Sequence, residues 1–454
     1  MSKTVKLKKG LDIRLIGAAN KVKAEVAMPK MVSVKPSDFH GMTPKMLVKE
    51  GQEVKAGTII FQDKYNEPIK FSSPVSGKVE EIVRGEKRRI LEVLISTSQD
   101  QQFETSDVKS VESMSNDEVK ATMLASGLWP FVKQRPLDIV ANPINEPKAI
   151  FVSAFDSSPL APDFDYVLEG EGKAFNAGLE ALKKLTSGKV HLTLNGKSTA
   201  NSTFTSVKGV EVNKIVGKHP AGNIGTQIHH IDPVNKGEFV WTVNAQDVAI
   251  IGRYFLTGQY NAKRTIALTG SEIKNPQYID TIMGANVADL LDGQITSDNV
   301  RVISGNVLTG DKIAQDGYLG FYHNQITVIP EGNEYKFFLT KGWLGLGFDK
   351  FSNSRLFPTF LLPKSKNFCL DTNTNGEERA FVMTGEMEKV FPFDILPMQL
   401  AKAAITDDID GMENLGIYEV APEDFALCEY VCTTKIDIQD KIRQGLDLIA
   451  SECM

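Results

Sequence analysis

Short strands separated by glycine turns fill the stretch between Met46 and Ile95. In the segments LVKEGQEVKAGTIIF, IKFSSPVSGKVEEIV and RRILEVLI, apolar and polar residues alternate, as is typical of half-buried strands. This alternation is the strongest constraint on the fold, because a period of two cannot build the apolar face of a helix. The sequence therefore predicts an all-β domain near the start of the chain.

The same stretch carries a regular spacing of valine and glycine. Val48, Gly51, Val54 and Gly57 follow the pattern V-x-x-G-x-x-V-x-x-G, and S-P-V-S-G-K-V follows at Ser73–Val79. These motifs resemble the biotinyl/lipoyl domain family, and the resemblance implies a β-barrel.

In carriers of that family, the modified lysine lies at the tip of a tight hairpin shortly before the second motif. Here the nearest lysine, Lys64, lies ten residues before Pro74, and the intervening YNEPI would enlarge the hairpin. We therefore expect Lys64 to be a surface residue of a docking barrel, with a lipoyl or biotin carrier as the alternative.

The chain is too long for a single core, because its 454 residues exceed the roughly 250–300 at which one core stops growing. Residues 99–117 are rich in Ser, Gln, Asp and Glu and predict an exposed connection. A helix at Glu118–Gly127, a strand at Lys148–Phe155, a helix at Gly172–Leu185 and a strand at Lys189–Asn195 then follow. This alternation predicts a β-α-β domain.

Further along, short strands are expected at 265–270, 299–305, 324–330 and 335–340, around a helix-like stretch at Asp280–Leu291. This order suggests a small α+β domain. The tail is more helical, most clearly at 394–405 and 422–432.

Charge and hydropathy exclude several classes of protein. Lys and Arg total 51 against 57 Asp and Glu, a net charge of −6, so a nucleic-acid-binding surface lacks its usual basis. The longest apolar runs, such as Ala149–Val152 and Val248–Ile251, are far shorter than the roughly 20 residues that cross a bilayer. The basic N-terminus has no apolar signal-peptide core, so we expect the chain to stay in the cytoplasm.

Glycine-rich nucleotide motifs are incomplete. Gly217 and Gly222 have the spacing of a P-loop, but Asn223 and Ile224 follow instead of Lys and a hydroxyl residue. Gly170-x-Gly172 lacks the third glycine of a dinucleotide fingerprint, so we expect no nucleotide site at either place.

Four cysteines are too few for a disulfide framework and fit a reducing compartment. Cys428 and Cys432 lie one helical turn apart and could supply half of a metal site, but no second pair of ligands accompanies them. We expect two buried cysteines of a helix.

Three histidines, His219, His229 and His230, lie within twelve residues and have Asp232 close by. Together they could bind a metal. The segment is rich in Gly and Pro and has no H-E-x-x-H motif, which favours a packed turn with hydrogen-bonded histidines.

Six segments, taken in chain order, resemble a single family. They are KKGLDIRLIG, VKEGQEV with DKYNEPIKFSSPVSGKVEEIVRGEKR, SGLWPFVKQRP, GKHPAGNIGTQIHHIDPVN, RVISGNVLTG and ALCEYVC. On these motifs the chain is identified as a member of the family formed by the A subunit of the sodium-translocating NADH:quinone reductase. The resemblance implies a cofactor-free, peripheral protein at the cytoplasmic face of the bacterial inner membrane. Its partners would be the five other subunits of the complex, some of them integral membrane proteins.

That family is more distantly similar to the C subunit of Rnf complexes and to the flavin subunit of complex I. Those relatives have a glycine-rich flavin loop where this chain has Ser126–Val132, with bulky Leu, Trp and Phe. The resemblance therefore places NADH, flavins, iron–sulfur clusters and Na⁺ with the whole complex. An independent flavin- or iron–sulfur-containing NADH dehydrogenase subunit is the alternative.

The resemblance also implies a contribution to quinone binding, complex assembly and quinone reduction. A quinone head requires an aromatic or apolar cleft with one or two hydrogen-bond donors. Residues of this kind gather in two short stretches, and ordinary interdomain packing is the alternative for both. The candidates are Phe39, His40, Met42, Trp129, Phe131, Lys133 and Arg135.

The expected fold is a multidomain α/β protein with four parts. They are a lipoyl/biotinyl-like β-barrel at 1–105, a Rossmann-like α/β domain at 106–258, a β-grasp-like (SLBB) α+β domain at 259–340 and a C-terminal helical domain at 341–454.

Overall fold

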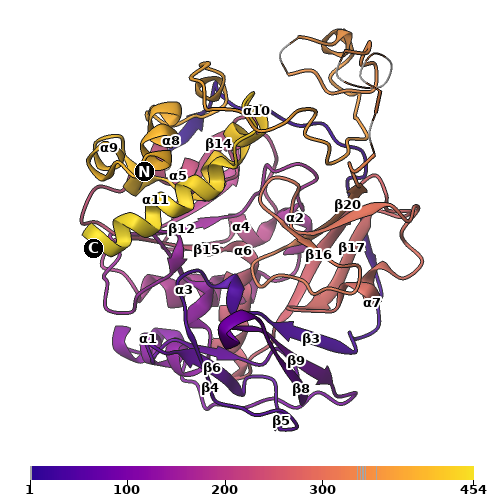
Figure 1. Cartoon of the computed structure of the whole chain (residues 1–454). Helices are drawn as coiled ribbons and strands as arrows, with labels where there is room; N and C mark the ends of the chain where they lie inside the picture. The colour runs from indigo at the N-terminus through magenta and orange to yellow at the C-terminus, as the bar shows by residue number, and fades with distance from the viewer. Residues whose placement is uncertain are drawn as a thin grey trace.

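A computed structural model describes residues 3–453 except 335, 338, 340, 341, 343 and 354. Figure 1 shows the barrel strands at the bottom, a central sheet with helices, a second sheet at the right and the C-terminal helices at the upper left. The strand predicted over 335–340 lies partly outside the described residues.

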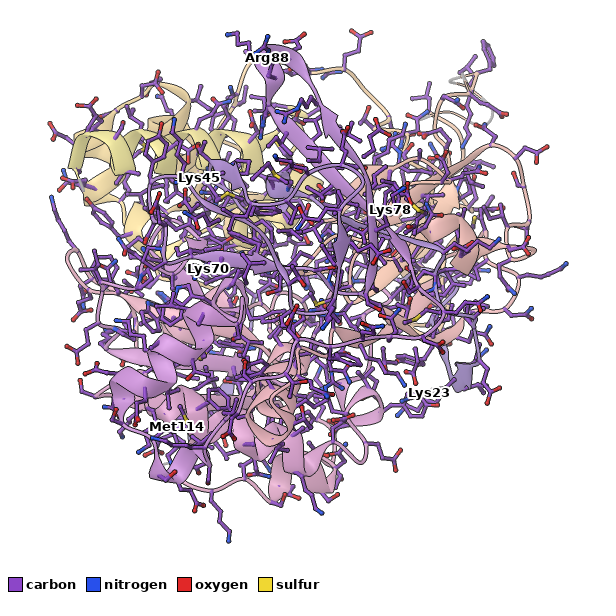
Figure 2. All side chains as sticks on the ribbon, turned by 90° about the horizontal axis from the view of Figure 1, so that it is seen from below. Lys23, Lys45, Lys70, Lys78, Arg88 and Met114 are labelled. Carbon is purple, nitrogen blue, oxygen red and sulfur yellow. The ribbon has the colours of Figure 1, made fainter. Side chains whose placement is uncertain are left out.

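Two antiparallel sheets near the N-terminus form the predicted all-β unit. One consists of β3 (Met31–Val34), β9 (Ile90–Thr97), β8 (Gly77–Arg84) and β5 (Glu53–Val54), and the other of β4 (Pro44–Met46), β6 (Ile59–Asp63) and β7 (Lys70–Ser72). Val79, Val93 and Ile95 point inward and are fully buried, which confirms the predicted alternation. The β8–β9 hairpin extends past the barrel, with Arg88 at its tip (Figure 2).

The central sheet has seven strands in the described chain. Their order is β1 (Thr4–Lys6), β14 (Glu211–Val216), β13 (Lys189–Asn195), β12 (Ala149–Ser153), β15 (Val240–Asn244), β10 (Lys133–Arg135) and β11 (Ile139–Val140). The first five are parallel and the last two antiparallel. Helices cover both faces, because Ile150 and Val152 belong to one buried cluster while Ala149 and Phe151 pack with Ile228 in another.

Eleven α-helices are present in the described residues. They are α1 (Asn116–Ala125), α2 (Phe164–Val167), α3 (Gly172–Lys183), α4 (Ser202–Thr205), α5 (Ile224–Ile231), α6 (Ala245–Thr257), α7 (Val287–Leu291), α8 (Pro397–Ile405), α9 (Ile409–Asn414), α10 (Ala426–Val431) and α11 (Ile438–Cys453). The packed turn predicted around the histidines is therefore wrong for Ile224–Ile231, which forms a helix once the glycine- and proline-rich residues have ended.

A second sheet of six strands lies beside the barrel. Its order is β19 (Asp311–Ile313), β18 (Val300–Ser304), β20 (Gln325–Pro330), β16 (Lys263–Thr269), β17 (Gln277–Ile282) and β2 (Asn20–Ala24). The helix-like stretch predicted at Asp280–Leu291 is wrong in its first part, which belongs to β17. Gly284 has a φ of +72°, and the side chain of Asn286 caps the short helix that follows, so the helix begins late.

The first 24 residues do not join the barrel sheets. Strand β1 is the edge of the central sheet, and β2 is the edge of the six-stranded sheet. Between them, Leu15 forms a β-bridge with Phe368 near the C-terminal helices. The N-terminal segment thus contacts three parts of the molecule that lie far apart in the sequence.

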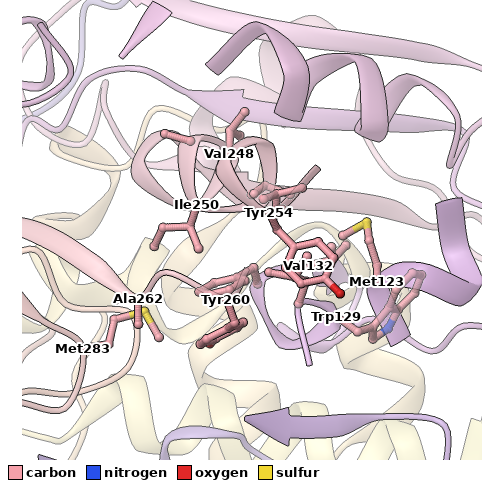
Figure 3. Packing of buried hydrophobic residues seen from close by; sticks show 14 of the residues in the cluster. Met123, Trp129, Val132, Val248, Ile250, Tyr254, Tyr260, Ala262 and Met283 are labelled. Carbon is pink, nitrogen blue, oxygen red and sulfur yellow. The ribbon is translucent and has the colours of Figure 1, made fainter. Parts of the chain in front are cut away.

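One buried cluster runs without interruption from the barrel into the α/β domain. It contains Val93 of the barrel, Trp129 after α1, and Tyr254 of α6. Figure 3 shows Trp129, Tyr254, Tyr260 and Met283 in this continuous core. The barrel is therefore held by apolar packing against the rest of the chain.

Candidate functional site

Phe39 lies at the boundary between the barrel and the six-stranded sheet. It follows the 3₁₀ helix η1 (Pro36–Asp38) and is almost fully buried. Its ring centroid is 4.4 Å from that of Phe71 on β7, 4.8 Å from Phe321 and 5.9 Å from Tyr322. Phe321 and Tyr322 precede β20, so the contact joins residues from distant parts of the sequence.

Phe131 approaches the same place from the α/β domain. It ends the 3₁₀ helix η4 (Trp129–Phe131), and its ring stacks on Phe321 at 5.0 Å with an interplanar angle of 27°. The hydroxyl of Tyr322 donates a hydrogen bond of 2.7 Å to the carbonyl of Pro130. Three parts of the chain therefore meet in one set of rings, which we call the aromatic junction: Phe39, Phe71, Phe131, Tyr260, Phe321 and Tyr322.

Lys133 adds a cation to this junction. It lies on β10 with its Nζ 5.2 Å from the centroid of the Tyr322 ring, an arrangement that allows a cation–π interaction. The same Nζ forms an ion pair of 2.7 Å with Asp138. Lys133 is half-buried, so its charge is held at the edge of the rings rather than in bulk water.

A shallow, solvent-open cleft with a cavity volume of about 10 Å³ lies against the junction. Its walls come from β3 and η1, from β7 and the residues after it, and from the six-stranded-sheet domain. The lining residues are Ser33, Val34, Lys35, Asp38, Ser72, Pro74, Met283, Gly284 and Phe321. A Cβ at Gly284 would overlap the carbonyl oxygen of Ser33, so glycine is needed where the two domains touch.

Asp38 is the carboxylate of this cleft. Its Oδ2 accepts a hydrogen bond of 2.8 Å from the backbone N–H of Phe321. Burial raises the pKa of the Asp38 carboxyl to about 6, although the Lys35 ammonium and the N–H of Phe321 both oppose the rise. Lys35 itself donates to the carbonyl of Tyr318 at 3.1 Å. The cleft thus combines an aromatic edge, a cation and a carboxyl that exchanges protons near neutral pH.

None of the seven sequence candidates lines this cleft, although Phe39, Phe131 and Lys133 belong to or adjoin the aromatic junction. Three others have surroundings of their own. His40 is exposed, and its Nε2 is 2.7 Å from a carboxylate oxygen of Asp447 on α11. Trp129 is fully buried, and its indole N–H donates to the carbonyl of Ala141 at 2.6 Å. Met42 is half-buried and packs against the main core. All three are close to Phe39 or Phe131 in the sequence, but the polar groups of His40 and Trp129 have partners elsewhere.

Arg135 is buried and points toward the C-terminal helices. Its guanidinium pairs with Asp424 at 2.8 Å and with Glu423 at 2.6 Å, both in the 3₁₀ helix η8 (Pro422–Phe425), and lies 3.7 Å from Asp138. Burial raises the pKa of Glu423 to about 7, while Arg135 opposes the rise. For Asp138, burial would raise the pKa, but Lys133 and Arg135 hold it below its usual range. This network fixes β10, and with it Lys133, to the C-terminal part of the chain.

The histidines that follow Gly217 in the sequence have separate partners. The Nδ1 of buried His219 is 3.1 Å from the hydroxyl of Ser157. The Nδ1 of His229 is 2.8 Å from a Glu419 carboxylate oxygen, and its Nε2 accepts from the N–H of Asp394. Within the described ranges, no group of three or more His, Cys, Asp or Glu residues is arranged to hold a metal ion.

The two helix cysteines and the barrel lysine also have defined environments. Cys428 in α10 and Cys432 just after it are buried and free, and the Sγ of Cys432 is 3.0 Å from the hydroxyl of Thr434. Lys64 lies exposed in the turn between β6 and β7, 5.3 Å from the ring centroid of Tyr65.

Sequence reasoning missed six members of the site: Lys35, Asp38, Phe71, Tyr260, Phe321 and Tyr322. Asp38 adjoins Phe39 and could have been included for that reason alone. The adjacent rings of Phe321 and Tyr322 after Gly320 are a visible signal in sequence, but nothing local indicates that they reach the barrel.

Three family models match the chain in succession. They are described as the NqrA N-terminal barrel-sandwich hybrid domain over residues 5–98, the NqrA second alpha/beta domain over residues 114–260 and the NQRA C-terminal domain over residues 265–315. These matches confirm a multidomain α/β chain with a barrel-sandwich N-terminal domain, a second α/β domain and an SLBB domain.

Curated proteins are similar to the chain along almost their whole length. A protein named as the A subunit of Na(+)-translocating NADH-quinone reductase, from Marinomonas sp. (strain MWYL1), is 39% identical over 450 residues, which cover 98% of this chain and 99% of the relative. The protein of the same name from Neisseria meningitidis serogroup A is 39% identical over 452 residues, covering 99% and 100%. That from Yersinia pestis bv. Antiqua (strain Angola) is 38% identical over 452 residues, with the same coverage.

Among solved structures, a chain of the NAD⁺-reducing NiFe-hydrogenase in the H2-reduced state is similar to 49% of this chain and 48% of its own length. The identity is 10% and the TM-score 0.36, which is too low to support an argument about fold or function.

Proposed function

The chain belongs to the family of the A subunit of Na(+)-translocating NADH-quinone reductase, and we propose that within this complex it holds a quinone head in the cleft beside the aromatic junction. As a subunit of that reductase it takes part in an oxidoreductase complex together with other subunits. The cleft is the single observation that carries the quinone proposal.

The chemistry of the cleft suits a quinone. A quinone ring is flat and apolar, and its two carbonyl oxygens accept hydrogen bonds. The part of the Phe321 ring that lines the cleft gives the quinone ring an apolar surface to pack against. The Lys35 ammonium donates one N–H to the carbonyl of Tyr318 and has further N–H groups for a quinone oxygen. The cleft has a cavity volume of about 10 Å³, room for about one water molecule, so a quinone head would enter only as the lining side chains move apart, and an isoprenoid tail would remain outside.

Asp38 supplies the proton chemistry in this proposal. Reduction of a quinone to a quinol takes up two electrons and two protons. With a pKa near 6, the Asp38 carboxyl can deliver a proton to a carbonyl oxygen and recover one from the solvent-open cleft. The electrons would come from other subunits, and Phe39 and Phe131 would keep the Phe321 ring in place.

The remaining sequence candidates have positioning roles in this proposal. Arg135 holds β10, which carries Lys133, and Trp129 fixes the backbone beside Phe131. His40 would tie the loop after η1 to α11 through Asp447.

In this proposal the chain lies at the cytoplasmic face of the bacterial inner membrane, docked on integral membrane subunits, with five other subunits in the complex. Support comes from the names of its relatives, which describe a sodium-translocating reductase. No helix among the described residues is both long and apolar enough to span a bilayer.

A photoreactive quinone analogue tests the site in the assembled complex. We expect labelling of peptides that contain Asp38 and Phe321, which line the cleft, and competition by unlabelled quinone. Labelling confined to other subunits would contradict the quinone proposal.

The Asp38→Asn variant tests the proton role separately. It should still be labelled, because the amide oxygen can accept from Phe321, but quinol formation at pH 6 should fall at least tenfold. In the unsubstituted complex, the rate should fall as the pH rises through about 6, because the protonated carboxyl is the donor. Asp165→Asn, at another half-buried carboxyl, is the control and should leave the pH profile unchanged.

A further inference from the structure

Exposed apolar side chains are concentrated in one segment between β20 and α8. Of the twenty large hydrophobic residues exposed in the described chain, seven lie between Leu344 and Leu362. Figure 1 shows this segment as orange loops that stand out from the body beyond the end of β20. We call residues 344–353 and 355–366 the apolar protrusion. Its exposed apolar members are Leu344, Leu346, Phe348, Leu356, Phe360, Leu361 and Leu362.

The degree of exposure is high for residues of this size. Leu346 is 71% exposed, Leu356 73% and Leu361 74%. Isolated apolar residues on a surface are ordinary, but this concentration of exposed leucine and phenylalanine in one short segment is typical of an interaction site.

The charge of the protrusion is opposite to that of the chain. It contains Lys350, Arg355, Lys364 and Lys366 but a single acid, Asp349, so its net charge is 4 − 1 = +3 against −6 for the whole chain. Lys350 donates to the carbonyl of Gly342, whereas Arg355, Lys364 and Lys366 are exposed. Cations therefore lie among and after the apolar side chains, where they could form the rim of an interface.

The base of the protrusion is fixed to the six-stranded sheet. Glu331, which directly follows β20, pairs with Arg301 on β18 at 2.6 Å and accepts from the hydroxyl of Thr372 at 2.6 Å. These hydrogen bonds hold the pKa of Glu331 at about 2, well below its usual value. The backbone N–H of Gly332 also donates to the hydroxyl of Thr372. Both ends of the segment are thus tied together, which lowers the entropy lost when the protrusion binds.

We propose that the apolar protrusion docks into an apolar groove with an acidic rim on another subunit of the reductase complex. Family membership supplies such partners, because the relatives are named as one subunit of a larger reductase. The acidic rim follows from the cations at Arg355, Lys364 and Lys366.

A lipid bilayer is a poorer occupant. Apart from the short 3₁₀ helix at Pro358–Leu361, the described part of the protrusion has no helix or strand. Irregular backbone in hydrocarbon leaves N–H and C=O groups without hydrogen-bond partners, which is unfavourable. A protein groove can bind those groups, and a bilayer core cannot.

Co-purification tests the proposal on the full-length chain in the complex. A Leu356→Ser/Leu361→Ser variant would be expressed with the other subunits, one of which carries an affinity tag. We expect its recovery with the tagged subunit to fall at least tenfold, while the thermal midpoint of the isolated chain stays within about 2 °C of the unsubstituted one.

The matched control is Ile144→Ser/Leu256→Ser, at two similarly exposed apolar positions outside the protrusion. It should co-purify normally. Full recovery of the protrusion variant would overturn the proposal. The proposal would also be overturned if the unsubstituted chain floated with protein-free vesicles of anionic lipid and the protrusion variant did not. The occupant would then be the membrane.

A crosslinking measurement avoids destabilising substitutions. When the assembled complex is irradiated, a photoreactive benzoylphenylalanine at position 361 should give a covalent adduct with one of the other subunits. An adduct with lipid alone, or no adduct, would contradict the proposal. Neither result bears on quinone labelling at the cleft, so the two proposals can fail independently.

Discussion

At the scale of single residues, Arg135 illustrates how burial changes the role of a charge. In the sequence it stands two residues after Lys133 and resembles a second cation for a quinone site. In the structure its guanidinium is 1% exposed and is surrounded by Asp138, Glu423 and Asp424. A buried cation must be paired, and the acids that pair with this one come mainly from a helix almost 290 residues away.

We predict that Arg135→Met destabilises the protein in a pH-dependent way. The substitution leaves the buried carboxyl of Asp424 and the half-buried carboxyl of Glu423 without their cation, and the loss at Asp424 alone should cost about 3 kcal/mol. Burial already raises the folded-state pKa of Glu423 to about 7, and loss of Arg135 should raise it further. A carboxyl whose pKa is raised on folding favours the folded state when protonated, and this contribution is lost as the pH rises through the folded-state value.

The loss of stability of Arg135→Met relative to the unsubstituted chain should therefore be largest at pH 8 and become smaller toward pH 5. Thermal unfolding midpoints measure this loss. Lys45→Met, which removes an exposed ion pair with Glu67, should change the midpoint little at either pH. A deficit for Arg135→Met that does not vary with pH would contradict this account.

At the scale of elements, α3 and α6 cross unusually closely on one face of the central sheet. A Cβ at Gly178 of α3 would overlap the carbonyl oxygen of Val248, and a Cβ at Gly252 of α6 would overlap that of Ala174. Glycine normally weakens a helix interior by about 1 kcal/mol. Here it lets the two backbones approach, so the packing of the helices outweighs the loss of helix propensity.

We predict that Gly252→Ala lowers stability even though alanine is the better helix former. The new methyl group would push α6 away from α3 and cost about 1–3 kcal/mol, as overpacking does. The thermal unfolding midpoint measures this loss. Lys173→Ala, at an exposed position of α3, is the control and should leave the midpoint within about 1 °C. A Gly252→Ala midpoint equal to or above that of the control would show that the helices can separate without cost.

At the scale of the whole molecule, the N-terminal segment connects parts that are distant in sequence. Strand β1 pairs with β14, and β2 pairs with β17. The side chain of Lys3 donates to the carbonyl of Ile231, and the backbone N–H of Leu7 to that of Val216. The segment therefore covers edges of two sheets before the barrel begins.

We predict that deletion of residues 1–7 destabilises the central sheet without unfolding the barrel. The backbone groups of β14 would lose their partners at a new sheet edge, which also favours aggregation. The thermal midpoint should fall by several degrees and light scattering on heating should increase. Lys6→Ala keeps the strand backbone and should behave like the unsubstituted chain. An unchanged midpoint for the deletion would mean that β1 contributes nothing to the sheet.

Local patterns in the sequence are sufficient where the neighbours along the chain decide the structure. The strand at Lys189–Asn195 and the start of the helix at Gly172 appear as predicted, because period and flanking residues are local signals. The sequence predicts a helix-like stretch from Asp280, but pairing with β16 places Asp280 in a strand instead. Phe39, Phe131 and Lys133 were chosen as candidates by residue type, and their contact with quinone remains a prediction.

The sequence by itself determined the family, the barrel motifs and the order of the domains, since all of these are carried by residues close together in the chain. Only the tertiary structure decided which candidates join the aromatic junction and which are paired elsewhere, because Phe321 reaches Phe39 and Glu423 reaches Arg135 across hundreds of residues. Contacts of this kind depend on how whole domains pack, and burial then sets which charges are paired and which carboxyl stays near neutral pKa.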